Sequence, residues 1–282
     1  MKYLFVADAF VDQYSGGAEL TTQAIMSGCK KKPYSRINAS QVTNDLIMKF
    51  KDHYWIIGNF ASLKDKVKVM ICKNVKYSIV EYDYKFCMFR SMDKHQYIKS
   101  EPCDCYKKPE AKINKVFYGY AEKIWFMSEE QRDIFLEKIP TMKKEKCEVL
   151  SSVFSKGDLR FMDSIKDNPK SDNYLILESE SWIKDTAGCI QYAKENNIPY
   201  ELVKGLSYPE MLIKMSTSKG LIFRPVGGDT CPRIVIEAKL LNCDLILNDN
   251  VQHKNETWFN GPREDCYKYM NERVDKFWEF YE

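Results

Sequence analysis

Short apolar runs alternate along the chain with amphipathic runs of helical periodicity. Alternation of this kind is typical of a parallel sheet covered by helices on both faces, so the sequence predicts an α/β fold. The apolar runs of the first half predict strands at Tyr3 to Asp8, Ile37 to Val42, Tyr54 to Asn59, Tyr77 to Tyr82, Lys123 to Met127 and Glu148 to Ser152.

One long stretch, Asp83 to Pro109, interrupts this alternation. It has little periodicity and is rich in Lys, Asp, Cys and aromatic residues. Loops of such length in a compact domain usually have a function or are mobile, and we expect a long loop here.

A polar segment, Asp163 to Asn173, predicts a linker, and the alternation restarts directly after it. The last stretch, Arg263 to Glu282, has the 3.6-residue spacing of an amphipathic helix. We therefore expect two Rossmann-like domains, at residues 1–168 and 169–262, facing across a cleft, and a final helix at 263–282 that packs back on the first domain. The second domain is predicted to contain strands Tyr174 to Glu178, Tyr200 to Lys204, Gly220 to Arg224 and Asp244 to Asn248, with helices Thr186 to Asn196, Tyr208 to Ser216 and Arg233 to Leu241.

Length and charge limit the possible functions. A chain of 282 residues with 44% hydrophobic content is long enough for two domains. The 43 basic and 40 acidic residues nearly balance, at a net charge of +3, which argues against nucleic acid and acidic membranes as partners. Because no apolar run is long enough for a signal peptide or a membrane span, we expect a cytoplasmic protein.

The ten cysteines are interpreted in that reducing setting as small buried hydrophobic residues. Only Cys103 and Cys105, with His95 nearby, are spaced suggestively for a metal. Zinc sites usually combine two cysteine pairs with two-residue spacers, so we favour ordinary thiols in a loop and expect no metal. A metal site at Cys103 and Cys105 stays the alternative.

The first candidate site follows the first strand, at Gly16 and Gly17. The two glycines permit positive φ, and the helix after them starts with amides that can bind an anion or a sugar hydroxyl. The turn matches neither the dinucleotide-binding fingerprint nor the Walker motif. An ordinary tight connection between strand and helix is the structural alternative.

The second candidate site follows the strand that ends at Arg224. Gly227 and Gly228 free the backbone, and Pro232 suits the first turn of a helix. Asp229 then lies in the loop and Glu237 on the helix, which favours two carboxylates facing one cleft. Carboxylates accept hydrogen bonds from sugar hydroxyls, and a diphosphate needs amides or a cation. In the alternative interpretation Asp229 caps the helix and Glu237 is a surface acid.

Three segments together resemble the large retaining GT-B glycosyltransferase family that includes sucrose synthases and bacterial α-glucosyl and α-mannosyl transferases, known as glycosyltransferase family 4-like or glycosyl transferases group 1. The segments are Gly16-Gly17-Ala18-Glu19, Phe126-Met127-Ser128 before Glu129, and Pro225 to Cys243. The resemblance implies a compact GT-B enzyme with an acceptor-side first domain and a second domain that binds the nucleotide sugar.

The resemblance also implies roles for individual residues. Asp229 would approach the transferred sugar and Glu237 would hold the ribose. Gly16 and Gly17 would contact the donor phosphate or the acceptor. The loop of Gly227 and Gly228 and the backbone around Thr230, Cys231 and Arg233 would cradle the diphosphate, and Glu19 and Ser128 would lie on the acceptor side.

The sequence departs from the family at several positions. The first acid is usually glutamate, and here it is Asp229. Of the arginine and lysine that usually neutralise the leaving diphosphate, only the lysine has a counterpart, Lys184, for which a surface lysine is the alternative. Arg224 or Arg233 would supply the missing charge. A histidine expected after the fourth strand is absent from Glu81-Tyr82-Asp83-Tyr84, which leaves Asp83 as the candidate for acceptor recognition.

The implied reaction is metal-independent transfer of a hexose, with retention of configuration, from a UDP-, GDP- or ADP-sugar to an acceptor glycan or small molecule. We expect front-face attack in which the leaving phosphate serves as base, and electrostatic stabilisation by Lys184 and a helix N-terminus. The alternatives are a GT-B-like sugar-nucleotide epimerase or phosphorylase, and a catalytically weak protein that binds nucleotide sugars.

Overall fold

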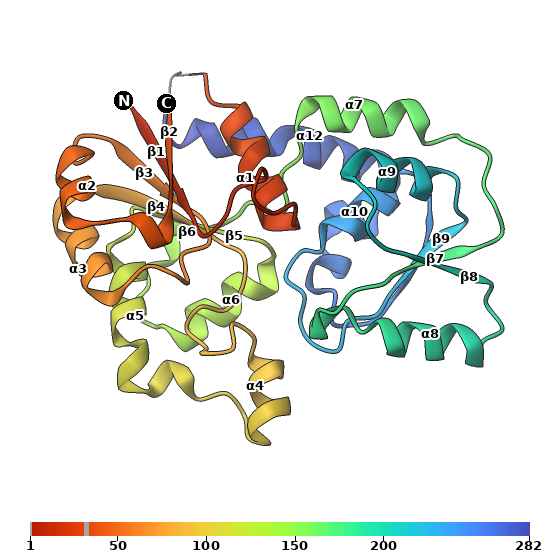
Figure 1. The fold of residues 1–282 in the computed structure, drawn as a ribbon, viewed down its shortest axis with the longest axis horizontal. Coiled ribbons are helices and arrows are strands. Elements are labelled where there is room, and N and C mark those ends of the chain that lie inside the picture. Colours follow the sequence, from red (N-terminus) through yellow and green to blue (C-terminus); the bar gives the residue numbers. More distant parts are fainter. Residues whose placement is uncertain (1, 31–33) are drawn as a thin grey trace. The chain divides into compact units, whose positions relative to one another are not determined.

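The computed structural model describes residues 2–30 and 34–282, which form two compact units (Figure 1). Unit 1 comprises Met1–Val153 and Lys276–Glu282, and unit 2 comprises Phe154–Asp275. The domain limits predicted at residues 168 and 262 stay predictions.

Unit 1 is built on a six-stranded sheet in the order β2-β1-β3-β4-β5-β6. Every pairing in it is parallel, which confirms the predicted α/β class. The strands are β1 (Tyr3–Ala7), β2 (Ser35–Asn38), β3 (Tyr54–Ile57), β4 (Lys76–Glu81), β5 (Lys123–Phe126) and β6 (Cys147–Val149). The helices are α1 (Gly17–Ser27), α2 (Asn44–Lys49), α3 (Asp65–Asn74), α4 (Met92–Lys99), α5 (Lys112–Tyr120) and α6 (Glu129–Lys138).

Both faces of this sheet are buried, as alternate residues of β1 show. Leu4 and Val6 join a large apolar core with residues of α3, α5 and α6. Tyr3 and Phe5 contact the ring of Trp278 from the C-terminal helix, with centroids 5.0 and 6.3 Å apart. A strand buried on both faces must be apolar throughout, which explains the uninterrupted apolar run Tyr3–Ala7.

Unit 2 contains a four-stranded parallel sheet in the order β10-β9-β7-β8. Helix α8 covers one of its faces, and α9 and α10 cover the other (Figure 1). The strands are β7 (Tyr174–Leu177), β8 (Tyr200–Val203), β9 (Gly220–Phe223) and β10 (Asp244–Leu247). The helices are α7 (Lys156–Ile165), α8 (Thr186–Glu195), α9 (Tyr208–Ser216), α10 (Arg233–Leu240), α11 (Thr257–Asn260) and α12 (Arg263–Glu279), the last of which continues into unit 1.

The predicted return of the C-terminal helix to the first domain is confirmed. Trp278 Nε1 donates a hydrogen bond to the Ile25 carbonyl oxygen at 3.0 Å. The Tyr281 hydroxyl lies 2.5 Å from Ser78 Oγ and accepts from Trp125 Nε1 at 3.1 Å. Aromatic side chains with satisfied polar atoms can be buried at little cost, so they fix the end of the chain on the sheet of unit 1.

Three sequence predictions need correction. The strand expected from Ile37 to Val42 is β2, which ends at Asn38 and is followed by a 3-10 turn, Ala39–Gln41. The segment from Asp83 to Pro109 is not one loop, because it contains α4, which starts after the N-cap Ser91. The linker expected from Asp163 is helical up to Ile165, the end of α7. Among the described residues no helix is both long and apolar enough to span a membrane.

Candidate active site

Most of the candidate residues of unit 2 follow the carboxyl ends of its parallel strands. Lys184 lies in the 3-10 turn Trp182–Lys184 after β7, and Arg224 directly follows β9. Asp229 lies in the loop between β9 and α10. Ligands of open α/β sheets bind at this edge, where the loops and helix N-termini gather.

The structure brings Lys184 and Asp229 together. Lys184 Nζ donates to Asp229 Oδ2 at 2.8 Å and lies 4.9 Å from the centre of the Phe223 ring. The backbone of Asp229 is fixed by a hydrogen bond from its amide to the Asn250 carbonyl oxygen, at 2.8 Å. Lys184 is therefore not an unpaired surface lysine. The side chains are 25% and 15% exposed, so a ligand can still reach them.

Asp229 does not cap α10. The N-cap of this helix is Pro232, no described side chain caps it, and its first turn contains no acidic residue. Gly227 and Gly228 lie in the loop before it, and Thr230 and Cys231 are buried next to its start. Because no carboxylate stands in the first turn of α10, the partial positive charge of this N-terminus favours an anion, which agrees with the diphosphate prediction.

Arg233 and Glu237 form a buried ion pair one helical turn apart on α10. Arg233 Nε donates to Glu237 Oε1 at 2.9 Å, and another nitrogen of its guanidinium donates to the Tyr208 hydroxyl at 3.1 Å. The guanidinium carbon lies 3.7 Å from the centre of the Phe154 ring. Burial raises the pKa of Glu237, and Arg233 and Tyr208 oppose this rise. Glu237 is only 4% exposed, so it is not a surface acid.

This pairing limits what Arg233 and Glu237 can offer a ligand. The guanidinium already has a carboxylate, a hydroxyl and an aromatic ring as partners, all within unit 2. The sequence interpretation weighed each residue alone. Residues four apart on a helix lie on the same face, so this spacing of Arg233 and Glu237 could have predicted their ion pair.

Arg224 lies in a different place from Lys184 and Asp229. Its guanidinium carbon stacks 4.1 Å from the centre of the Tyr192 ring on α8. Together with Asn248 and Asn250 it lines a cavity of about 360 Å³, which neither Lys184 nor Asp229 lines. Both asparagines donate to the Pro225 carbonyl oxygen, at 2.9 and 2.7 Å, and so fix the loop after β9. The sequence interpretation missed Tyr192 and both asparagines.

In unit 1 the reason for glycine at position 16 differs from the predicted one, which was a positive φ. Gly16 is the N-cap of α1 with φ −102°, so it does not use the left-handed region. A Cβ at this position would lie 2.6 Å from Glu19 Oε2 and 2.6 Å from a ring carbon of Tyr14. Gly16 is therefore suited to let the Glu19 carboxylate fold back over the start of the helix, and Gly17 opens the helix itself.

Glu19 and Asp83 are connected through Arg90 and Asn59. Arg90 Nε donates to Asp83 Oδ2 at 2.7 Å, and an Arg90 guanidinium nitrogen donates to Asn59 Oδ1 at 3.1 Å. Burial raises the pKa of Glu19, although backbone hydrogen bonds, Arg90 and Asn59 oppose the rise. Burial also acts to raise the pKa of Asp83, but the charges of Lys85 and Arg90 outweigh it and the pKa is lowered.

Asp83 also belongs to a buried charge network that the sequence did not indicate. Lys85 Nζ donates to Glu81 Oε1 at 2.6 Å and to Asp83 Oδ1 at 3.1 Å. Glu81 is fully buried and also accepts from the Tyr118 hydroxyl. Asp83 is thus held in place by the buried Lys85 ammonium and the half-exposed Arg90 guanidinium.

Ser128 is linked to Asp83 through Gln131. It is buried and is the N-cap of α6, where its Oγ accepts from the Gln131 amide at 3.1 Å. The Gln131 side chain in turn donates to the Asp83 carbonyl oxygen at 3.0 Å. The geometry gives Ser128 a capping role, and its contact with an acceptor stays a prediction.

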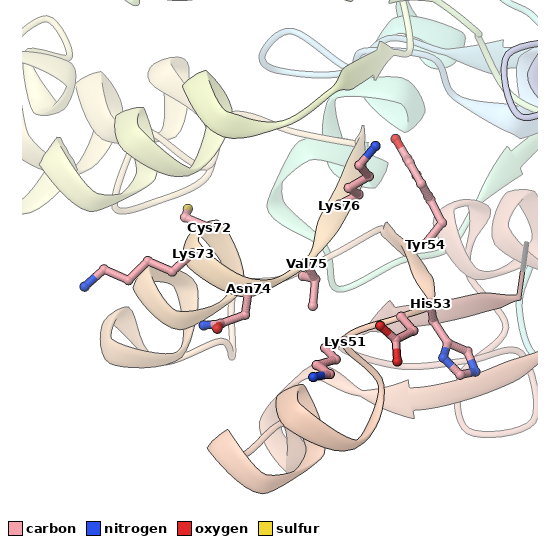
Figure 2. Close-up of a pocket in the computed structure, with 9 residues that line it drawn as sticks. Lys51, His53, Tyr54, Cys72, Lys73, Asn74, Val75 and Lys76 are labelled. Atoms are coloured by element: carbon pink, nitrogen blue, oxygen red, sulfur yellow. The ribbon is translucent and has the colours of Figure 1, made fainter.

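A cavity of about 430 Å³ lies at the amino ends of β3 and β4, the sheet edge opposite to these residues (Figure 2). Its lining includes Lys51, Lys73 and Lys76. These lysine side chains point in different directions in Figure 2 and do not converge on one point. We assign no function to this cavity, because ligands of such sheets bind at the carboxyl edge.

Comparison with known proteins shows the fold. No protein-family model matches the sequence, and no curated protein matches it. Among solved structures, the trehalose-6-phosphate synthase OtsA is similar over 100% of this chain and 98% of its own, with a TM-score of 0.64 and 8% identity. WaaG, a glycosyltransferase of lipopolysaccharide biosynthesis, covers 97% of this chain and 90% of its own at a TM-score of 0.55 and 10% identity.

HepE from Anabaena, solved with UDP and glucose, covers 98% of this chain and 90% of its own at a TM-score of 0.55 and 11% identity. At such identities the similarity shows the fold alone. The predicted class is confirmed: the chain has the α/β GT-B fold, with two Rossmann-like units.

Proposed function

We propose that the protein is a glycosyltransferase that moves a hexose from a nucleotide diphosphate sugar to a hydroxyl group of a glycan or small molecule. The observation that carries the proposal is the Lys184–Asp229 pair at the carboxyl edge of unit 2, in a chain with the GT-B fold. UDP-sugars are the first donors to test, because HepE was solved with UDP and glucose, and a similar structure, described as trehalose-6-phosphate from E. coli, was solved with UDP-2-fluoro glucose.

The chemistry requires stabilisation of a growing negative charge. The bond between the anomeric carbon and the diphosphate oxygen breaks, and a bond from that carbon to the acceptor oxygen forms. The acceptor proton passes to the leaving phosphate, which serves as the base in a transfer with retention. Lys184 and the N-terminus of α10 are preorganised for the diphosphate charge, so turnover is expected without added Mg²⁺ or Mn²⁺.

The carboxylates have distinct proposed roles. Asp229 holds the Lys184 ammonium and contacts the transferred sugar. Glu237 contacts the ribose with the carboxylate that Arg233 positions. Arg224 adds positive charge from its cavity beside Asn248 and Asn250. On the acceptor side, Glu19 and Asp83 are proposed to accept hydrogen bonds from the acceptor hydroxyls.

The test uses the full chain with UDP-, GDP- and ADP-sugars. Donor affinity is measured by calorimetry, and turnover by release of the nucleoside diphosphate with and without simple sugar acceptors. Lys184→Met is expected to lower the rate of release about 100-fold, as removal of one electrostatic stabiliser does, with a smaller effect on affinity.

Lys219→Met is the matched control. Lys219 also lies over an aromatic ring, 5.7 Å from the centre of Tyr174, but precedes β9, so its replacement should leave the rate unchanged. Equal rates for both variants would contradict the assignment of Lys184. Donor isomerisation or phosphate-dependent cleavage without an acceptor would indicate an epimerase or phosphorylase, and donor binding without turnover a binding protein.

A further inference from the structure

Four potential metal ligands meet inside the segment between β4 and α5. They are Cys87 from the turn before α4, His95 from α4, Cys103 from the following loop and Cys105 from the 3-10 turn Cys105–Lys107. One ligand atom from each residue lies within 4.8 Å of the ligand atoms of the other three. Among residues 2–30 and 34–282, these four residues form the one group of potential metal ligands that lie close enough together to share an ion.

The distances between these atoms fit a tetrahedral zinc ion. His95 Nδ1 lies 3.3 Å from Cys105 Sγ and 3.8 Å from Cys87 Sγ. Zinc bonds of about 2.3 Å to sulfur and about 2.0–2.1 Å to nitrogen, at tetrahedral angles, place N and S about 3.6 Å apart and two S atoms about 3.8 Å apart. Shifts of less than about 1 Å would therefore complete the coordination.

The surroundings also suit a bound metal. Cys87, His95 and Cys105 are buried, and Cys103 is half-buried. His95 is 1% exposed, and its Nε2 has no hydrogen-bond partner in the described part of the chain. The other ring nitrogen, Nδ1, faces the Cys87 and Cys105 thiols, which are weak hydrogen-bond partners, and a metal bond at Nδ1 would replace these weak contacts. A cavity of about 350 Å³ that both Cys87 and Cys105 line gives an ion access to the cluster.

We propose that Cys87, His95, Cys103 and Cys105 bind one zinc ion as a structural site. Three thiolates and an imidazole are soft ligands that select zinc over magnesium or calcium. They fill all four tetrahedral positions and leave none for a substrate, which is typical of structural zinc. This proposal departs from the expectation of ordinary thiols and extends its alternative, which considered only Cys103 and Cys105 with His95 nearby and omitted Cys87.

The role of the ion follows from the segment that it would cross-link. Between β4 and α5 the only α-helix in the described chain is α4, and its sole buried residue is His95. A helix of 8 residues with one buried side chain has little packing to hold it. Zinc would tie this helix to Cys87 on one side and to the loop of Cys103 and Cys105 on the other.

The first experiment measures zinc in the full chain, purified without a metal-affinity tag, by mass spectrometry of the elements. About one zinc per chain is expected after dialysis, because such sites bind tightly. Cys103→Ser should weaken zinc binding by more than about 100-fold, since loss of a direct ligand exceeds the 10- to 100-fold effect of an outer-shell change. Cys147→Ser is the matched control, because Cys147 is also half-buried but lies outside the cluster, and it should keep its zinc.

A second measurement does not depend on the variant folding. The unmodified chain is stripped of metal and reconstituted with Co²⁺, whose visible and near-ultraviolet spectrum distinguishes tetrahedral from octahedral sites and shows thiolate ligands by charge transfer. A tetrahedral spectrum with thiolate charge transfer, lost on addition of Zn²⁺, is expected. Four outcomes would overturn the proposal: a metal-free chain that takes up no Co²⁺, an octahedral spectrum, equal zinc in Cys103→Ser and Cys147→Ser, or a disulfide between cysteines of the cluster in the freshly purified protein.

Discussion

Replacement of Glu237 separates a structural role of this residue from a role in donor binding. Glu237 is 4% exposed and Arg233 is 5% exposed. Removal of the carboxylate in Glu237→Ala leaves a buried guanidinium with Tyr208 and the Phe154 ring, and with the Asp158 carboxylate no closer than 3.8 Å. Loss of donor binding in this variant would not by itself identify a ribose contact, because the loop before α10 can also move.

The size of the effect follows from the burial of both groups. Breaking a buried pair by removing one partner costs about 3–5 kcal/mol, since the remaining charge is desolvated without compensation. Glu237→Gln keeps a side-chain oxygen that can accept from Arg233 Nε and loses only the charge. Its expected cost is about 1.5–3 kcal/mol, the usual worth of a charged hydrogen bond. Either value is a large part of a total stability of about 5–15 kcal/mol.

Urea unfolding of the full chain, followed by circular dichroism, measures both variants. Glu264→Ala is the control, because Glu264 also pairs with an arginine, Arg263 at 3.9 Å, but its side chain is 76% exposed. Its cost should stay below about 1 kcal/mol, as for other exposed pairs. If Glu237→Ala were as stable as Glu264→Ala, the buried pair of Arg233 and Glu237 would not stabilise the fold by the expected amount.

Donor affinity is then compared only where the variant is folded. Glu237→Gln keeps the shape of the side chain, and a ribose hydroxyl that donates to the carboxylate should bind the amide more weakly. We expect donor affinity to fall about tenfold or more, the loss that accompanies one charged hydrogen bond. Unchanged affinity in a folded Glu237→Gln protein would leave Glu237 with the positioning of Arg233 as its only role.

Three further predictions concern other parts of the chain. Lys184→Met should lower the free energy of unfolding less than Glu237→Ala does, because Lys184 and Asp229 are 25% and 15% exposed and water can partly solvate the remaining carboxylate; an equal loss for the two variants in urea unfolding would contradict this. Trp278→Ala should cost about 3–5 kcal/mol in the same assay, and a cost below 1 kcal/mol would mean that the C-terminal helix does not anchor on unit 1. Burial raises the pKa of Glu19, so the stability linked to this group is present below its unfolded pKa and is lost as the pH rises through its folded pKa. Glu19→Gln should therefore unfold at higher urea than the wild type at about pH 8 and lose this advantage by about pH 4, whereas an advantage independent of pH would refute the assignment.

The sequence could predict the strands, but it could not predict which candidate catalytic residues contact one another. Strands such as Tyr3–Ala7 are apolar on both faces, a local pattern that needs no knowledge of the partner strand. Lys184 and Asp229 were each predicted as candidates, but their contact depends on β7 and β9 being neighbours in the sheet. Helix α4 was missed because its only buried residue is His95, which gives no apolar periodicity.

Of the four proposed metal ligands, Cys87 was omitted from the sequence analysis, and Cys103 and Cys105, with His95 nearby, were kept only as an alternative. The spacing of Cys87, His95, Cys103 and Cys105 contains no pair of cysteines with a two-residue spacer, so no familiar zinc pattern is present. Their proximity depends on the turn at Cys87 and on the direction of α4, which only the folded chain provides. The connection of Glu19 to Asp83 was equally hidden, because Arg90 joins them from outside the predicted motifs.

Arg90 connects the proposed metal site with Glu19 and Asp83, the carboxylates proposed to bind the acceptor. It has φ 57°, a conformation that costs a residue with a side chain of order 1 kcal/mol and persists only where neighbours hold it. Asp83 and Asn59 hold its guanidinium, and Cys87 and His95 flank it along the chain. If zinc fixes Cys87 and His95, loss of the ion should loosen the backbone of Arg90. All three residues belong to unit 1, so the donor-binding residues proposed in unit 2 should stay in place. Under both proposals, metal removal should then reduce acceptor-dependent turnover while donor affinity is kept.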